Sequence, residues 1–247
     1  VLQVWGGFAE SNQDGLAEPG KFNEPWGVAV GPDGSVYVAD TWNHRVQKFT
    51  ADGSFITQWG VSDLAENPNG FYGPRGIAVN ADGRVFVADT GNKRISVFDA
   101  NGVFITHFGE PGFDLGQFDE PVGVTVGQNG EVYVADTWNQ RIQVFLPDES
   151  KTQYFVNSSW DVAGWNGQSI ENKPFLATDI FGNVYAADPE GYRILGFTPD
   201  GSFLRGWGQY SPTTDGFGLP ISLAFDPSNG VWVADSGNNV LLHFTFP

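Results

Sequence analysis

The chain contains no cysteine, so disulfide bonds and thiolate chemistry are excluded. Methionine is absent as well, even at Val1, so we expect a processed product or a fragment of a larger chain. Basic residues are few: 12 Lys and Arg stand against 29 Asp and Glu, which gives a formal net charge of −17. Because nucleic-acid affinity depends on cations that neutralise phosphates, and these cations are scattered, we expect no nucleic-acid partner.

Long apolar runs are also missing, so we expect no direct insertion into a membrane. Hydrophobic residues nevertheless make up 40% of the chain and aromatic residues 15%, which indicates a globular rather than a disordered protein. The 33 glycines and 15 prolines are dispersed along the chain and indicate many turns.

A short string recurs five times along the chain. Val-Ala-Asp or Ala-Ala-Asp ends at intervals of 47 to 52 residues, at Asp40, Asp89, Asp136, Asp188 and Asp235. A proline leads each unit, at Pro25, Pro74, Pro121, Pro174 and Pro220. In the first unit, apolar alternation and two Asp-Gly turns predict four strands over 26–31, 35–40, 44–50 and 54–59, which we call a to d.

Four short antiparallel strands per unit, repeated radially, are typical of a β-propeller. We therefore predict an all-β, five-bladed β-propeller of four-stranded antiparallel blades, with residues 1–247 forming a single domain. The predicted blades cover about 25–60, 74–109, 121–167, 174–208 and 220–246. The last blade has only three predicted strands, whereas residues 1–6 match an outer strand such as 55–60. We predict that this N-terminal strand closes the last blade.

A second pattern follows each aspartate, and it resembles the NHL repeat. Asn43-His44-Arg45 carries the repeat's recurring letters verbatim, and related strings follow Asp89 and Asp136. Unit four has Gly191 in place of the asparagine, and unit five has Val240 in place of the arginine. The resemblance implies a propeller that binds other molecules, with a minority of relatives acting as lyases or hydrolases. NHL propellers more often have six blades, so five is a departure.

The recurring aspartates and arginines favour a structural role, because an active site is used once whereas these residues return in each blade. A carboxylate that ends strand b and a guanidinium that begins strand c can pair across the tight loop between them. The residues assigned to this structural motif are Asp40, Arg45, Asp89, Arg94, Asp136, Arg141, Asp188, Arg193 and Asp235.

The candidate binding residues lie at loops and strand starts. Trp42 and Trp138 occupy the b–c loops, where they either offer an exposed ring to a partner or lie against a neighbouring proline or phenylalanine. Arg75 begins an inner strand near the axis, where it either anchors an anionic group or pairs with a neighbouring acid. The full candidate set is Trp26, Trp42, Asn43, Arg75, Trp138, Asn139 and Phe175.

The long d–a connectors, such as 7–24 and 110–120, are rich in acidic residues, and variable loops on a rigid scaffold often carry function. We find no catalytic constellation and predict no cofactor and no metal site, since the three histidines fall at different depths of their blades. The favoured function is a non-catalytic binding scaffold for a protein or a glycan, outside the cell or at its surface. The alternatives are a metal-dependent lyase or hydrolase with its site at the central channel, and an assembly module.

Overall fold

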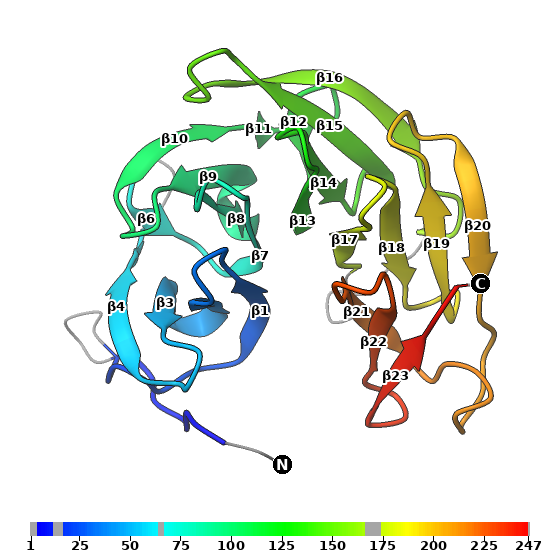
Figure 1. Ribbon diagram of the computed structural model, residues 1–247. Coiled ribbons are helices and arrows are strands. Elements are labelled where there is room, and N and C mark those ends of the chain that lie inside the picture. Colours follow the sequence, from blue (N-terminus) through cyan, green and yellow to red (C-terminus); the bar gives the residue numbers. More distant parts are fainter. Residues whose placement is uncertain (1–3, 12–16, 64–66, 166–173, 247) are drawn as a thin grey trace. The chain divides into compact units, whose positions relative to one another are not determined.

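The computed structural model describes residues 4–11, 17–63, 67–165 and 174–246, and Figure 1 shows their strands as arrows. The protein has the all-β fold of a five-bladed propeller, with five antiparallel sheets that follow one another along the chain. Successive strands pair within each sheet, because short turns join them. In the described part of the chain, the helical elements are two single 3-10 turns, η1 (Thr41–Asn43) and η2 (Thr90–Asn92).

The sheets are called blades 1 to 5. Blade 1 consists of β1 (Pro25–Val30), β2 (Val36–Asp40), β3 (Arg45–Phe49) and β4 (Phe55–Trp59). Blade 2 consists of β7 (Pro74–Val79), β8 (Val85–Asp89), β9 (Arg94–Phe98) and β10 (Phe104–Phe108). Blade 3 consists of β13 (Pro121–Val126), β14 (Val132–Asp136), β15 (Arg141–Pro147) and β16 (Tyr154–Asp161). Blade 4 consists of β17 (Leu176–Thr178), β18 (Val184–Asp188), β19 (Arg193–Phe197) and β20 (Phe203–Trp207), and blade 5 of β21 (Pro220–Phe225), β22 (Val231–Asp235) and β23 (Val240–Phe244).

Connectors between blades form loops whose two arms run side by side as short parallel pairs. β5 (Val61–Ser62) pairs with β6 (Gly70–Phe71), and β11 (Glu110–Pro111) pairs with β12 (Gln117–Phe118). Single parallel bridges join Phe8 to Phe22 and Tyr210 to Phe217. In each case a recurrent phenylalanine ends the returning arm, and Phe71, Phe118 and Phe217 are fully buried there. The phenylalanine thereby ties its connector to the blade.

The chain divides into two compact units, residues 1–121 with 147–155 and residues 122–146 with 156–247. In the first unit, alternate residues of blades 1 and 2 form a core that includes Tyr37, Val46, Val87 and Phe98. The described part of the second unit has two such clusters, whose members include Trp165 in one and Tyr185 and Phe217 in the other. Period-two alternation places these side chains on one face of each strand.

A tryptophan at the end of an outer strand covers a turn glycine of the following blade. The Trp59 ring lies 5.8 Å from that of Phe98, and a Cβ on Gly102 would lie 2.5 Å from the indole. Gly102 also has a φ of 83°, which disfavours other residues. Trp160 repeats the arrangement over Phe197 and Gly201. The Asp-Gly and Asn-Gly turns therefore admit the ring as well as reversing the chain.

The N-terminal segment packs against blade 1. The Trp5 ring lies 4.6 Å from that of Phe49, and Trp5 covers Gly53 as Trp59 covers Gly102. Val4–Gly7 form no strand, and the sheet of blade 5 contains three described strands. The predicted pairing of residues 1–6 with the last blade falls partly on residues 1–3, which lie outside the described residues, and it stays a prediction.

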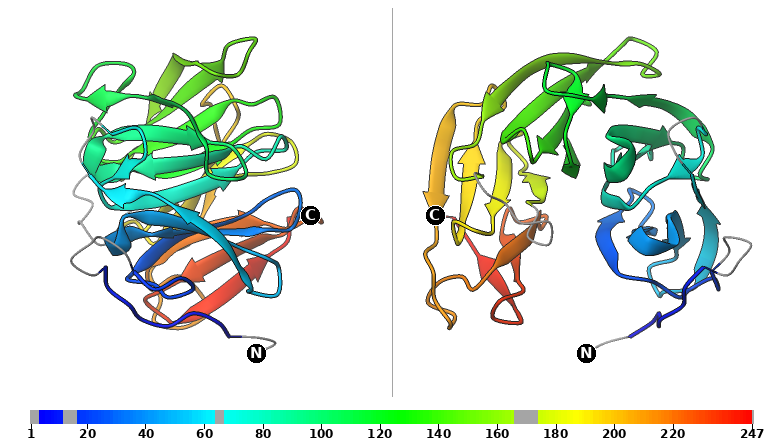
Figure 2. Two further views of the ribbon diagram at one scale, coloured as in Figure 1. Left: turned by 90° about the vertical axis from the view of Figure 1, so that its left-hand side faces the viewer. Right: turned by 180° about the vertical axis from the view of Figure 1, so that it is seen from behind.

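The long stretch after Leu146 forms an extended β15–β16 hairpin, which is visible in both views of Figure 2. The tip of this hairpin contacts blade 2. The Tyr154 ring lies 5.5 Å from that of Phe86 and 5.0 Å from that of Phe108, and Lys151 Nζ lies 2.6 Å from Asp82 Oδ2. Burial of the tyrosine ring explains why the hairpin is long.

Candidate binding surface

The b–c loop of each blade is organised by the buried aspartate that ends strand b. In blade 1, Asp40 accepts hydrogen bonds from the backbone N–H of Asn23 (2.7 Å), Asn43 Nδ2 (3.0 Å), Arg45 Nε (2.8 Å) and Gln47 Nε2 (3.1 Å). The same ion pair recurs at 2.9 Å in blade 2, 2.8 Å in blade 3 and 2.7 Å in blade 4. Four donors around one carboxylate compensate for the cost of burying its charge.

The arginine of this motif also holds the connector. Arg45 donates to the carbonyls of Ala17 (2.7 Å), Glu18 (3.0 Å) and Lys21 (2.8 Å). In blade 2, Arg94 donates to the carbonyls of Asn67 (3.1 Å) and Gly70 (2.8 Å). The motif therefore fixes both the b–c loop and the d–a connector, which emerge at the same end of the blade.

The structure places Asn43 inside this network and not on the binding surface where we predicted it. Asn43 is 2% exposed, and its Nδ2 donates to Asp40 and to the carbonyl of Ala9 (2.9 Å). Asn139 is half-buried and donates to Asp136 Oδ2 (2.8 Å). In both blades the asparagine side chain hydrogen-bonds to the buried carboxylate, because a buried charge requires hydrogen-bond donors.

The two loop tryptophans are exposed at the same end of their own blades. Trp42 is 45% exposed and Trp138 is 48% exposed. Trp42 Nε1 donates to Glu24 Oε2 (2.9 Å), which holds the indole while leaving much of its surface in solvent. Both rings are therefore partly exposed, and their role in binding stays a prediction.

Blade 2 presents an aromatic ring by a different route. Its b–c loop has Gly91 where Trp42 stands in blade 1, and the Tyr72 side chain fills the space above that glycine. The Tyr72 ring stacks on His44 with centroids 5.6 Å apart, and His44 Nδ1 accepts the backbone N–H of Gly73 (3.0 Å). Burial lowers the pKa of His44, although Asp40 acts in the opposite direction. A neutral imidazole thus supports an exposed tyrosine.

The connectors carry further exposed apolar side chains that the sequence reasoning missed. Phe113 is 76% exposed and Phe8 is 70% exposed, and both lie in connectors of the first unit. Leu115 and Tyr210 are exposed in the same class of segment. Aromatic residues in otherwise acidic connectors could have indicated these exposed side chains, but the sequence analysis considered only the carboxylates.

Arg75 is occupied by protein groups. Its Nη1 lies 3.1 Å from Glu120 Oε2, and its guanidinium carbon lies 4.6 Å from the Trp26 ring centroid. Burial lowers the pKa of Arg75, while Glu120 acts in the opposite direction. Phe175 belongs to the second unit, where it is half-buried and donates its N–H to the carbonyl of Ile221 (3.3 Å).

The histidines make separate contacts. His243 Nε2 lies 2.9 Å from Asp226 Oδ2 and its ring stacks on Trp232, whereas burial lowers the pKa of His107 in β10. Within the ranges that the structure describes, no three His, Asp or Glu side chains gather as a metal-ion site. The same residues include no helix with the length and hydropathy of a membrane span.

Residues 22–49, 71–98 and 118–145 match the family model of the NHL repeat. Three of the five blades are NHL repeats. Among curated proteins, 41 residues are 51% identical to Protein brain tumor of Drosophila melanogaster, and 36 residues are 56% identical to B-box type zinc finger protein ncl-1 of Caenorhabditis elegans. These matches span 17% and 15% of this NHL-repeat chain and 4% of each relative.

Solved structures resemble this chain in fold. A nidogen/laminin complex matches with a TM-score of 0.63 at 15% identity, over 96% of this chain and 84% of the other. A streptogramin B lyase matches with a TM-score of 0.60 at 18% identity, over 86% and 62%. Virginiamycin B lyase from Staphylococcus aureus matches with a TM-score of 0.62 at 15% identity, over 97% and 73%. Identities this low establish a shared fold, which serves different functions in different proteins.

Proposed function

We propose that this protein is a non-catalytic binding scaffold, and that its partner docks on the end of the blades that carries the b–c loops and d–a connectors. The observation that carries the proposal is the set of exposed aromatic rings on rigidly held loops at this end. In the first unit these rings are Phe8, Trp42, Tyr72 and Phe113. Tryptophan and tyrosine are enriched at interface hot spots, because a rigid ring buries much area at small entropic cost.

The charge of the chain favours a protein partner with a basic surface. The formal net charge is −17, and carboxylates of the connectors such as Glu10, Glu18 and Glu110 are exposed beside the aromatic residues. Opposite charge on the partner raises the association rate, and salt screens this steering. A glycan would instead stack on the tryptophans without such a salt dependence.

Alanine substitution of the exposed tryptophans tests the proposal. An array of basic peptides and an array of glycans are probed with the wild type, Trp42→Ala, Trp138→Ala and the control Phe181→Ala. Phe181 is equally suited to truncation because it is exposed, but it lies in an a–b turn at the other end of its blade. We expect the tryptophan variants to lose bound ligands at unchanged melting temperature, and the control to keep them. Equal binding by all four proteins would contradict the proposal.

A further inference from the structure

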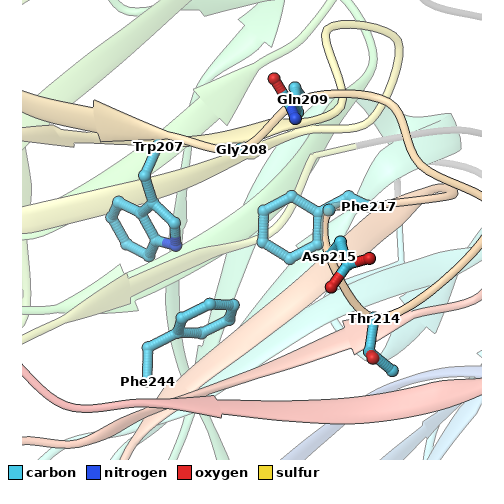
Figure 3. A pocket seen from close by; sticks show the side chains of 8 residues that line it. Trp207, Gly208, Gln209, Thr214, Asp215, Phe217 and Phe244 are labelled. Atoms are coloured by element: carbon cyan, nitrogen blue, oxygen red, sulfur yellow. The ribbon is translucent and has the colours of Figure 1, made fainter.

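A pocket of about 260 Å³ lies in the second unit, between the end of β20, the connector that follows it and β23. Three aromatic rings and a carboxylate line it, as Figure 3 shows, together with connector backbone: Trp207, Phe217, Phe244, Asp215, Thr214 and Gly216. The Phe244 ring lies 5.9 Å from that of Trp207 and 5.8 Å from that of Phe217. The pocket therefore combines π faces with a negative charge.

Connector carbonyls at the corresponding positions of blades 1 and 2 accept hydrogen bonds from an arginine. Arg45 donates to carbonyls one and four residues before Phe22, and Arg94 donates to carbonyls one and four residues before Phe71. Counting back from Phe217 in the same way gives the carbonyls of Gly216 and Thr213, and Gly216 lines the pocket. The chain has Val240 at the arginine position of blade 5, so its short side chain cannot reach these carbonyls.

The aspartate of blade 5 lacks the cation that its counterparts have. Asp235 is 1% exposed and accepts the backbone N–H of Leu219 (2.6 Å), that of Gly218 (2.9 Å) and Asn238 Nδ2 (2.8 Å). Within the described residues, no Lys, Arg or His lies within ion-pair distance of Asp235. Hydrogen-bond donors of the chain therefore satisfy the Asp235 carboxylate where a cation pairs with its counterparts.

We propose that this pocket binds a guanidinium group supplied by a ligand, beside the connector that the chain's own arginine holds in blades 1 and 2. The group donates to the Gly216 carbonyl and to the Asp215 carboxylate, and its flat face packs against Trp207 or Phe244. The Thr213 carbonyl is already bound by Asn238 Nδ2 (3.2 Å). Guanidinium suits such a site because it is planar, carries five donors and stacks on aromatic rings. The ligand is thus a small guanidinium compound or an arginine side chain of a polypeptide. This proposal is independent of the aromatic loop surface described above.

The test follows the Trp207 indole N–H resonance in ¹H–¹⁵N spectra of the full chain, assigned with a Trp207→Phe variant. The probe is ethylguanidinium, and the control is ethylurea, which has the same shape and no charge. We expect saturable shifts with ethylguanidinium only. Asp215→Asn should weaken binding by about 5-fold, because it removes a charge-assisted hydrogen bond. A blocked peptide with one central arginine forms a second arm, and binding tighter than that of ethylguanidinium identifies a polypeptide as the source.

Val240→Arg restores the arginine that binds the connector carbonyls in blades 1 and 2, and by occupying the Gly216 carbonyl it should abolish the shifts. Leu241→Arg is the matched control, because it adds the same side chain to the opposite, 68% exposed face of β23 and should leave binding intact. Equal response to ethylurea, undiminished binding by Val240→Arg, or the absence of a saturable shift would overturn the proposal. If Val240→Arg fails to fold, Asp215→Asn decides, since Asp215 is exposed and its substitution leaves the core untouched.

Discussion

Replacing Arg94 with leucine should destabilise the protein strongly, because Asp89 would keep its buried charge without its counter-ion. Arg94 Nε lies 2.9 Å from Asp89 Oδ2, and the Asp89 side chain is 0% exposed. Removing one partner of a buried ion pair costs about 3–5 kcal/mol. At roughly 2–4 °C per kcal/mol for a chain of this size, we expect the melting temperature to fall by about 6–20 °C.

The pH dependence distinguishes this charge effect from lost packing. Burial raises the pKa of Asp89, although its hydrogen-bond donors and Arg94 lower it. A carboxyl whose pKa is higher in the folded than in the unfolded state costs stability above its unfolded pKa of about 3.9, and this cost disappears as the pH falls. Loss of Arg94 raises that pKa further. The difference in melting temperature between wild type and Arg94→Leu should therefore narrow on acidification.

Thermal unfolding followed by circular dichroism between about pH 7.5 and about pH 5 measures both effects. The double variant Asp89→Asn with Arg94→Leu is the control, because it removes the stranded charge and should recover part of the loss. A cost below about 1 kcal/mol, which is ordinary for a surface substitution, would refute the reasoning. A difference in melting temperature between wild type and Arg94→Leu that stays the same at every pH would also refute it.

Three further predictions concern individual side chains. Gly102→Ala should lower the free energy of unfolding in urea by about 2–4 kcal/mol, since its Cβ would meet Trp59. Gly83 has a similar φ of 80°, but the nearest atom to its Cβ would lie at 3.7 Å, so Gly83→Ala should cost about 1 kcal/mol. Because burial lowers the pKa of His44, the protein should lose stability as the pH falls below about 6.5, and His44→Asn should flatten this part of the curve of melting temperature against pH. Trp42→Ala should leave the melting temperature within about 2 °C of the wild type, because a half-exposed ring contributes little packing; a fall of several degrees would show that the ring packs against its neighbours.

The blade architecture could be predicted from the sequence because its causes are local. Strand b of blade 1 was predicted within one residue of its observed start at Val36, and the Asp-Gly turns lie where they were expected. Alternation of apolar residues decides which side of a strand is buried, and a glycine with positive φ decides where the chain turns. The ion pair between Asp40 and Arg45 follows as well, because a tight loop leaves its two ends side by side.

The binding surface could be predicted only in part, because it depends on contacts between distant segments. Exposure of Trp42 depends on what the connector places beside it, and Asn43 is hidden because the first arm of the connector, at Ala9, covers it. The parallel pairing within the connectors, on which the exposure of Phe113 depends, has no periodic pattern in the sequence.

The sequence by itself determined the repeat, the strands, the turns and the motif that ties loop to connector, because hydrogen bonding and side-chain alternation act over a few residues. Only the tertiary structure decided that the β15–β16 hairpin packs on blade 2 and that Tyr72 takes the place of a loop tryptophan. It also decided that Trp207, Phe217 and Phe244 line a pocket together. These features arise from side chains far apart in sequence, whose meeting depends on how irregular connectors fill the space between regular strands.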